Sequence, residues 1–437
     1  MTRDGRRILA AQALRALGYG FGAVLLGVTL AAAGWSSAKV GLLLTGIVAG
    51  TALASLVVGA LGDRIGRRRL YAGLYGCLAV AGVAFGSTTR LWVLLAVALT
   101  GAVSTEVVES GPFTSLEQAM LPQAVDSTDP RARTRVFGVY NTIATLAGSL
   151  GALAVSGPAL LRDAGMRLPV GLPVEQRLFL VFVPIGVAGA AIAWSLSDAV
   201  ELDMDVEAGQ RPAQPGASRV LVALPLGRSR TTMLRLAGLF AVDAFGGGFV
   251  VQSFVAYWFR VRFGVSVELL GVVFFAIGLL QAGSFVVATR LAERIGLLPT
   301  MVATHLPSNL LLAAIPLAPT LTVAVALLLG RFALSQMDVP ARQAYVVALV
   351  APEERTAAVA TTNLARYLVR PAAPAVAGAA QQLAVGLPFV LAGGIKAAYD
   401  LALWSWFRRV ELPHHDQPGQ PQGEDVRAGQ AGRRRRA

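Results

Sequence analysis

The chain has 437 residues, of which 55% are hydrophobic and only 14% are charged, and its mean hydropathy is +0.61. Because a soluble domain usually carries about 25% charged residues, this composition excludes an ordinary soluble protein and predicts an integral membrane protein. The single cysteine, Cys77, excludes an internal disulfide and a cysteine-rich metal site, and the net charge of +13 has to be interpreted after the topology is assigned.

Twelve apolar segments follow one another along the chain, each close to the length of about 20 residues that a helix needs to cross a bilayer. A different stretch over 198–230, first acidic and then rich in Pro, Gly and Ala, separates the first six segments from the last six and predicts a linker. The apolar segments lie near residues 14–33, 39–61, 69–87, 91–112, 135–156, 178–196, 234–257, 265–288, 297–315, 321–342, 357–379 and 384–407.

These segments predict an all-α integral membrane protein with twelve transmembrane helices in two pseudo-symmetric six-helix bundles. The N-terminal bundle is expected over 1–197 and the C-terminal bundle over 231–412, joined by a cytoplasmic linker over 198–230. Residues 413–437 are polar and end in four arginines, which predicts a disordered cytoplasmic tail.

The arginines set the expected orientation, because they concentrate in the loops on one side of the predicted membrane. The positive-inside rule assigns that side, together with both termini, to the cytoplasm of a cell whose inner (plasma) membrane holds the protein. Membrane lipid is then the expected partner of these cations, and no nucleic-acid partner is needed to explain them. The cytoplasmic loops hold Arg3, Arg6, Arg7, Arg64, Arg67, Arg68, Arg69, Arg131, Arg133, Arg135, Arg211, Arg219, Arg228, Arg230, Arg294, Arg355, Arg408 and Arg409.

A charged phrase occurs twice in this apolar chain. It reads GALGDRIGRRRL at 59–70, and a weaker version reads ATRLAERIGLL at 288–298. Several matches in the same order indicate two homologous halves, an arrangement in which many transporters bind substrate at the repeat interface. At an offset of 230, GWS at 34–36 falls on GVS at 264–266, Gly41 on Gly271 and DRIG at 63–66 on ERIG at 293–296, and at an offset of 222 RTRVFGVYN at 133–141 falls on RTAAVATTN at 355–363.

The first copy resembles the loop 2–3 signature of the major facilitator superfamily, G-x-L-A-D-R-x-G-R-R, with Gly62 as the small residue before Asp63. The resemblance covers roughly residues 10–412, and the segment at 335–363 is similar to a group of prokaryotic members. It implies a secondary transporter of a small molecule that works by alternating access. Motifs of intramembrane proteases, serine hydrolases and nucleotide-binding loops are missing from the sequence, so neither an enzyme nor a cofactor is expected.

The resemblance also implies a gate, because loop 2–3 of this family helps to lock the cytoplasmic face when the transporter opens outward. Asp63 is then expected to meet the first amides of helix eleven or Arg355, and by the repeat Glu293 is expected to meet the start of helix five near Arg133. The simpler alternative is that these arginines only enforce topology. The gating candidates are Gly59, Asp63, Arg64, Gly66, Arg67, Arg68, Glu293, Arg294, Arg133 and Arg355.

Charged residues inside the predicted helices are candidates for substrate binding or proton coupling, because an unpaired charge at membrane depth is costly. Glu106 and Glu109 lie one turn apart in helix four and repel each other, which makes one of them the proton-carrier candidate. Arg331 is the candidate anchor for an anionic group, since guanidinium binds oxyanions in bidentate fashion. The complete set is Glu106, Glu109, Asp243, Arg331, Asp338 and Arg342, and no metal site is expected.

Several of these side chains have a plain structural interpretation as well. Asp338 and Arg342, like Lys396 and Asp400, are four residues apart and can form pairs within one helix. His305 is interpreted as structural. Family members line their central cavity with helices one, four, seven and ten, so aromatic residues of helices one and seven are further candidates for substrate contact. They are Tyr19, Phe21, Phe245, Phe254 and Tyr257.

The expected function is therefore proton-coupled secondary transport by a monomer. A multidrug or metabolite exporter of the same fold is the first alternative, although the glycine-proline signature of such proteins in helix five is reduced here to Gly157-Pro158. A non-transporting receptor or scaffold is the second alternative, and the charged phrase at 59–70 argues against it.

Overall fold

The computed structural model describes residues 2–105, 111–121, 130–157, 174–201, 229–351 and 354–410, and for Asp63 and residues 131–135, among a few others, it describes the backbone alone. Regular secondary structure within these ranges is entirely helical. An apolar chain in a bilayer satisfies its backbone hydrogen bonds within each segment, and helices do so.

Within the described ranges, the N-terminal half contains four helices of 21 to 30 residues, α1, α2, α3 and α6, together with shorter pieces. Its helices are α1 (Arg3–Ala32), α2 (Ser37–Ile65), α3 (Arg67–Ser87), α4 (Leu91–Ala98), α5 (Pro112–Met120), α6 (Pro130–Ala154), α8 (Val174–Arg177), η1 (Leu178–Val181), α9 (Phe182–Ser195) and η2 (Asp198–Val200). The C-terminal half has α12 (Arg230–Gly248), α13 (Gln252–Phe263), α14 (Val267–Ile295), α15 (Leu297–Ala314), η3 (Ile315–Leu317), α16 (Leu321–Ser335), α17 (Asp338–Ala348), α18 (Arg355–Val369), η5 (Arg370–Ala372), α19 (Ala373–Leu383) and α20 (Leu387–Phe407).

Ten helical segments in the described part of the chain are long and apolar enough to cross a membrane. The two other predicted spans, at 91–112 and 357–379, coincide with broken helices, α4 with α5 and α18 with α19. The breaks have local causes. Gly101, which follows α4, has a positive φ of 71°, and Pro371 lies in the η5 turn between α18 and α19. The predicted all-helical membrane fold is confirmed.

The internal repeat is visible in the backbone. Helices α2 and α14 each have 29 residues, and both their first and their last residues correspond at the offset of 230 seen in the sequence. The glycines that flank them correspond as well, with φ of 69° and 65° at Gly34 and Gly264 and of 95° and 91° at Gly66 and Gly296. Side chains rarely tolerate positive φ, so glycine is required at the same turns of both halves.

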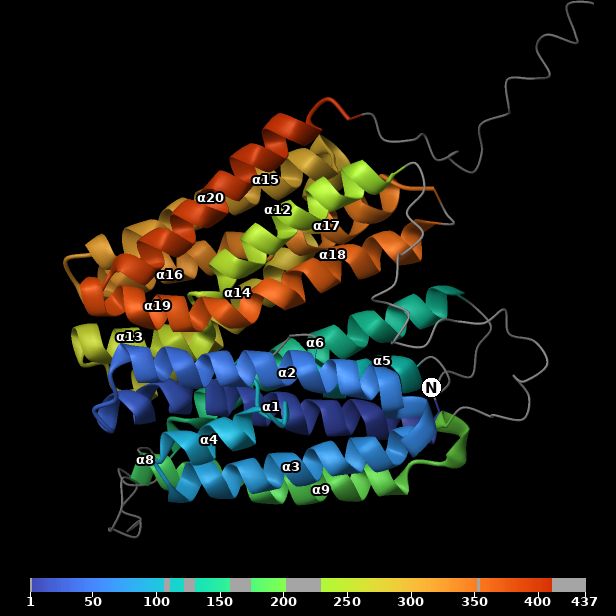
Figure 1. Cartoon of the computed structure of the whole chain (residues 1–437), viewed down its shortest axis with the longest axis vertical. Helices are drawn as coiled ribbons and strands as arrows, with labels where there is room; N and C mark the ends of the chain where they lie inside the picture. The colour runs from blue at the N-terminus through green and yellow to red at the C-terminus, as the bar shows by residue number, and fades with distance from the viewer. Residues whose placement is uncertain are drawn as a thin grey trace, which may run out of the picture.

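The two halves lie against each other and diverge toward the face that carries the N-terminus and the end of α20, here called the terminal face (Figure 1). They contact each other through α1 with α13, α2 with α19 and α6 with α14. The turns after α1 and α13 lie on the opposite face (Figure 1). The halves are thus closed against each other on the opposite face and separate toward the terminal face.

Small residues and hydroxyl groups form the contacts that hold the two halves together on the opposite face. A Cβ added to Gly41 would lie 2.3 Å from the carbonyl oxygen of Pro374, so α2 and α19 approach at backbone distance. The Thr45 hydroxyl accepts a hydrogen bond from the Ala375 amide at 3.0 Å, near the start of α19. Two further bonds cross the halves, from the Tyr257 hydroxyl to the carbonyl of Trp35 at 2.9 Å and from the Ser156 hydroxyl to the carbonyl of Glu268 at 3.1 Å.

Candidate functional site

A cavity of ≈ 370 Å³ lies between the two halves. Its size is in the range of sites for small molecules. One wall comes from α6 of the N-terminal half, and this wall is small and neutral, with Thr145, Gly148, Ser149 and Ala152. The opposite wall is built from α12 to α18 and α20 of the C-terminal half.

The C-terminal wall carries the charges. Among the described residues that line the cavity, five side chains are cationic and two are carboxylates. The cations are Arg331, Arg342, Arg366, Arg370 and Lys396, and the carboxylates are Asp243 and Asp338. Asp243, Arg331, Asp338 and Arg342, which the sequence predicts as separate candidates, are therefore brought together in one cavity.

Asp243 is the centre of an ion network that joins three helices. The Lys396 ammonium from α20 donates to Oδ1, and Nη1 of Arg342 from α17 lies 3.2 Å from Oδ2. The same Nη1 lies 3.4 Å from a carboxylate oxygen of Asp338, one turn earlier in α17. Asp243 is only 3% exposed, and a carboxylate so buried needs these cations to offset the cost of desolvation.

His305 links this network to a second buried carboxylate. Its Nδ1 lies 2.8 Å from Oδ1 of Asp400, and its Nε2 lies 3.7 Å from Oδ1 of Asp243. The Asn309 amide donates to the other oxygen of Asp400 at 2.8 Å and also lies 3.1 Å from Nδ1. Since a carboxylate oxygen only accepts, the contact with Asp400 favours a hydrogen on Nδ1. The imidazole thus stands between two carboxylates.

Arg366 and Arg331 also line the cavity. Arg366 in α18 has a buried Nε without a hydrogen-bond partner, and no ion pair or hydrogen bond of this side chain is found in the described part of the chain. Arg331 in α16 is 8% exposed, and the central carbon of its guanidinium lies 4.4 Å from the centre of the Phe332 ring.

A separate buried network lies in the N-terminal half, away from the cavity lining. Nη2 of Arg15 in α1 donates to Glu117 of α5 at 2.6 Å. The Tyr71 hydroxyl of α3 donates to the other oxygen of Glu117 at 2.7 Å, and the Tyr140 hydroxyl of α6 also donates to this carboxylate. Residue spacing along the chain does not predict this network. The signal available for it was an arginine at the start of an apolar segment, with no indication of its partner.

Some expectations from sequence spacing are wrong in detail. Asp338 and Arg342 do pair, but Lys396 pairs across the bundle with Asp243, and Asp400 pairs with His305, in place of a pair within α20. His305 forms buried hydrogen bonds, and it also lines the cavity, a position that its sequence context did not indicate. The reason is common to all three: residue spacing reveals neighbours on one helix and carries no information about the facing helix.

The expected lining by helices one and four is not found among the described residues, where α1, α4 and α5 contribute nothing to the cavity. Glu106 and Glu109 of helix four lie outside the described residues. The five candidate aromatics on helices one and seven are not among the described lining residues either. All five pack in or against the hydrophobic core.

The loop 2–3 residues make contacts within the N-terminal half. The Glu201 carboxylate accepts from the amides of Arg67 and Arg68 at 2.7 and 3.0 Å and so caps the start of α3. The Arg67 guanidinium donates to the carbonyl of Ala119 at 3.3 Å, and Arg68 pairs with Asp198. These arginines therefore bind the segment that follows α9.

The other gating candidates lie at or near the terminal face. Gly59, Arg64, Glu293 and Arg294 are exposed, and Arg355 at the start of α18 is half-buried. Gly66 forms the turn between α2 and α3. The side chains of Asp63 and Arg133 lie outside the described part, so the expected contacts between Asp63 and helix eleven and between Glu293 and helix five stay predictions.

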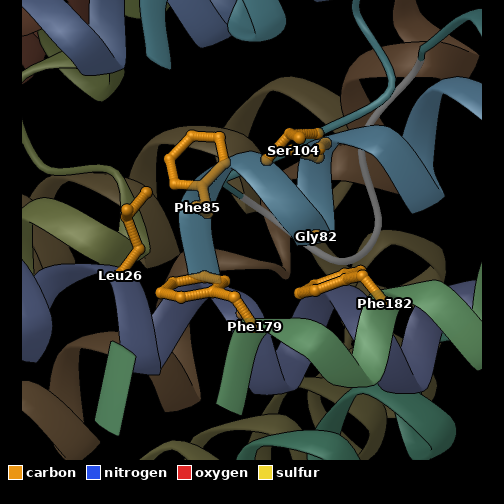
Figure 2. A pocket seen from close by; sticks show the side chains of 9 residues that line it. Leu26, Gly82, Phe85, Ser104, Phe179 and Phe182 are labelled. Carbon is orange, nitrogen blue, oxygen red and sulfur yellow. The ribbon is translucent and has the colours of Figure 1, made fainter. Parts of the chain in front are cut away.

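A smaller pocket of ≈ 10 Å³ lies inside the N-terminal half, between α1, α3 and α9. Figure 2 shows Phe85, Phe179 and Phe182 around it, with Leu26 and Ser104 at its edge. A void of this size holds one water molecule at most, and its walls are mainly apolar. It is a packing defect and not a site for a solute.

The comparisons with known proteins agree with this architecture. The family model described as Major Facilitator Superfamily matches residues 8–374. The uncharacterized membrane protein YJR124C of Saccharomyces cerevisiae (strain ATCC 204508 / S288c) is 26% identical over 434 residues, covering 94% of this chain and 95% of that protein. This relative comes from yeast, so it does not support the similarity to prokaryotic members.

Two solved structures show the same fold at low identity. The nucleoside transporter NupG matches with a TM-score of 0.68 at 11% identity, covering 93% of this chain and 100% of that one. A bacterial homolog to the human lysosomal transporter Spinster, in an inward-facing and occupied conformation, matches with a TM-score of 0.66 at 16% identity, covering 94% and 98%.

Two helical halves around a polar cavity define the fold of a multi-pass secondary transporter. The chain belongs to the major facilitator superfamily, whose model matches most of its length. The members of this family are transporters of small molecules and not enzymes.

Proposed function

We propose that this protein carries a small solute across the membrane by alternating access, with the cavity between the halves as the central binding site. The observation that carries the proposal is the cavity itself, which takes its walls from both halves. The contacts between α1 and α13 and between α2 and α19 close the halves on the opposite face, so a rocking motion that opened these contacts would expose the same cavity to the other side.

We further propose that both termini are cytoplasmic in the inner (plasma) membrane and that this conformation is inward-open. Exposed arginines at the terminal face support the orientation, because cations are retained on the cytoplasmic side. They include Arg3, Arg6, Arg64, Arg69, Arg294, Arg408 and Arg409. The gate of Asp63 with helix eleven and of Glu293 with helix five then belongs to the outward-open state, and the protein is proposed to work as a monomer.

We further propose that transport is coupled to a proton gradient. Glu106 and Glu109 remain candidate carriers, and the carboxylates of Asp243 and Asp338 in the cavity wall add two more. Export of a drug or metabolite is the alternative for the same fold.

A labelling experiment tests the access to the cavity. In a Cys77→Ser background, Ser149→Cys places a thiol in the N-terminal cavity wall and Ser36→Cys places one on the opposite face. A membrane-impermeant thiol reagent should label Ser149→Cys in inside-out vesicles and not in right-side-out vesicles, and it should label Ser36→Cys in the reverse pattern. Equal initial rates of labelling of Ser149→Cys from both sides would contradict a conformation open to one side only, and no labelling from either side would refute a solvent-filled transport cavity.

A further inference from the structure

The charge balance of the cavity points to the class of its ligand, an inference that rests on the proposed transport function. Both described carboxylates of the lining are engaged, Asp243 by Lys396 and Arg342 and Asp338 by Arg342. Among the described residues of the lining, cationic side chains outnumber carboxylates. A guanidinium such as that of Arg366, which has no ion pair in the described part of the chain, is costly at membrane depth unless an anion joins it.

We propose that the cavity binds a small organic oxyanion at Arg366 and that a proton enters on His305 together with it. Arg366 lines the cavity, its Nε has no hydrogen-bond partner, and its side chain makes no ion pair in the described part of the chain. A guanidinium offers a planar fork of donors that matches carboxylate, phosphate and sulfonate groups.

The facing wall fits the rest of such a ligand. Thr145 and Ser149 of α6 offer hydroxyl groups, and Gly148 and Ala152 leave room beside them. Among its described lining residues this wall has no carboxylate that would repel an anion. The anionic end of the ligand is thus expected at the C-terminal wall and its neutral end at α6.

The uptake of a proton is inferred from the ion network around Asp243 and His305 in the cavity wall. An anion near Arg342 and Lys396 attracts both cations and weakens their hold on Asp243. The His305 imidazole, between Asp243 of α12 and Asp400 of α20, then becomes the nearest group that can restore a positive charge. The other charged or titratable groups near it are Lys396 and Tyr399 of α20, Asp338 and Arg342 of α17 and Arg331 of α16. More negative charge in this surrounding favours imidazolium, so the anion and the proton bind together.

Thermal unfolding of the purified protein with probes of fixed charge tests the ligand class. The anionic probes are benzenesulfonate, succinate and glycerol 3-phosphate, the neutral probes are glucose and uridine, and the cationic probe is choline, each at about 10 mM, where binding raises the unfolding temperature by mass action. At least one anion should stabilise the protein and the cation should not. The member of the anionic set that binds best identifies the acid group. Stabilisation by neutral or cationic probes alone, or by none, would overturn the proposal.

Variants assign the residues. Arg366→Gln should weaken the affinity for the anionic probe about tenfold or more, Arg366→Lys should weaken it less, and the exposed Arg408→Gln is the matched control with unchanged affinity. Unfolding temperatures without ligand separate loss of binding from loss of folding. Equal affinity of Arg366→Gln and the native protein would refute the assignment.

The proton is tested with benzenesulfonate, whose charge is constant over the range used. Its affinity should fall as the pH rises from about 6 to about 8, because a proton that binds together with the anion becomes scarcer over this range. His305→Asn should retain binding and flatten this dependence. A pH dependence that persists in His305→Asn would assign the proton to another group and refute this part. If no anion binds while Ser149→Cys is still labelled from one side only, the proposal of an anionic ligand is refuted and the transport proposal is retained.

Discussion

At the scale of single residues, much of the buried charge in the described part of the chain lies in two networks, one in each half. In the N-terminal half, Arg15 and Glu117 are 3% and 0% exposed, and the Tyr71 and Tyr140 hydroxyls complete the hydrogen bonds of the carboxylate. Because the network joins four helices, α1, α3, α5 and α6, its integrity determines how this half packs.

Glu117→Ala is expected to lower the free energy of unfolding by about 3–5 kcal/mol, because it leaves the Arg15 guanidinium buried without a counter-charge. Glu117→Gln keeps one acceptor oxygen and the shape of the side chain, although its amide nitrogen can only donate, and it should cost less than Glu117→Ala. Thermal unfolding in detergent measures both. The double variant Arg15→Met with Glu117→Met is the control, and it should recover much of the loss. An unchanged unfolding temperature in Glu117→Ala would contradict the role assigned to this ion pair.

At the scale of elements, the helix-to-helix turns of the two halves obey the same backbone requirement. Gly66 between α2 and α3 and Gly296 between α14 and α15 have φ of 95° and 91°. Their surroundings differ, since a Cβ at Gly66 would lie 3.3 Å from the Glu201 carboxylate that caps α3, and a Cβ at Gly296 would only reach Pro299 at 3.7 Å.

Gly66→Ala and Gly296→Ala should each destabilise the protein by about 1–2 kcal/mol through backbone strain, and Gly66→Ala should cost more because it also disturbs the cap. Gly73→Ala is the matched control, since Gly73 lies inside α3 with open space around an added methyl group. It should leave the stability unchanged or raise it by up to about 1 kcal/mol. Unfolding temperatures measure all three, and equal effects at positions 66 and 73 would contradict the turn requirement.

At the scale of the whole molecule, the opposite face is closed by backbone approach and hydroxyl bonds between the halves, without an ion pair across it in the described part of the chain. Such a closure is weak enough to open. An added side chain in it should therefore shift the equilibrium between two conformations more readily than it unfolds either one.

Gly41→Leu is expected to force α2 from α19, because even a Cβ would lie 2.3 Å from the Pro374 carbonyl oxygen. The population should shift by about tenfold or more toward the state open at the opposite face, a factor that corresponds to roughly 1.4 kcal/mol. Labelling of Ser149→Cys from the side of the opposite face reports this shift. Gly76→Leu in α3, where an added Cβ meets nothing, is the control. Unchanged one-sided labelling in Gly41→Leu would show that this contact is not part of a gate.

The sequence alone predicted ten of the spans that the described part of the chain contains, the two halves and the repeat, because these depend on residue type and spacing along the chain. Apolar length decides which segments can cross a bilayer, and the offset of 230 between DRIG and ERIG matches the ends of α2 and α14 in the structure. It also identified Asp243, Arg331, Asp338 and Arg342 as charges at membrane depth, which the structure gathers in one cavity.

Only the tertiary structure decided which charges face each other. Lys396 pairs with Asp243, His305 stands between Asp243 and Asp400, and Arg366 stays without an ion pair in the part of the chain that the structure describes. These relations join helices that are far apart in sequence. The spacing of residues along one helix defines a face, and the partner of that face depends on how the helices pack.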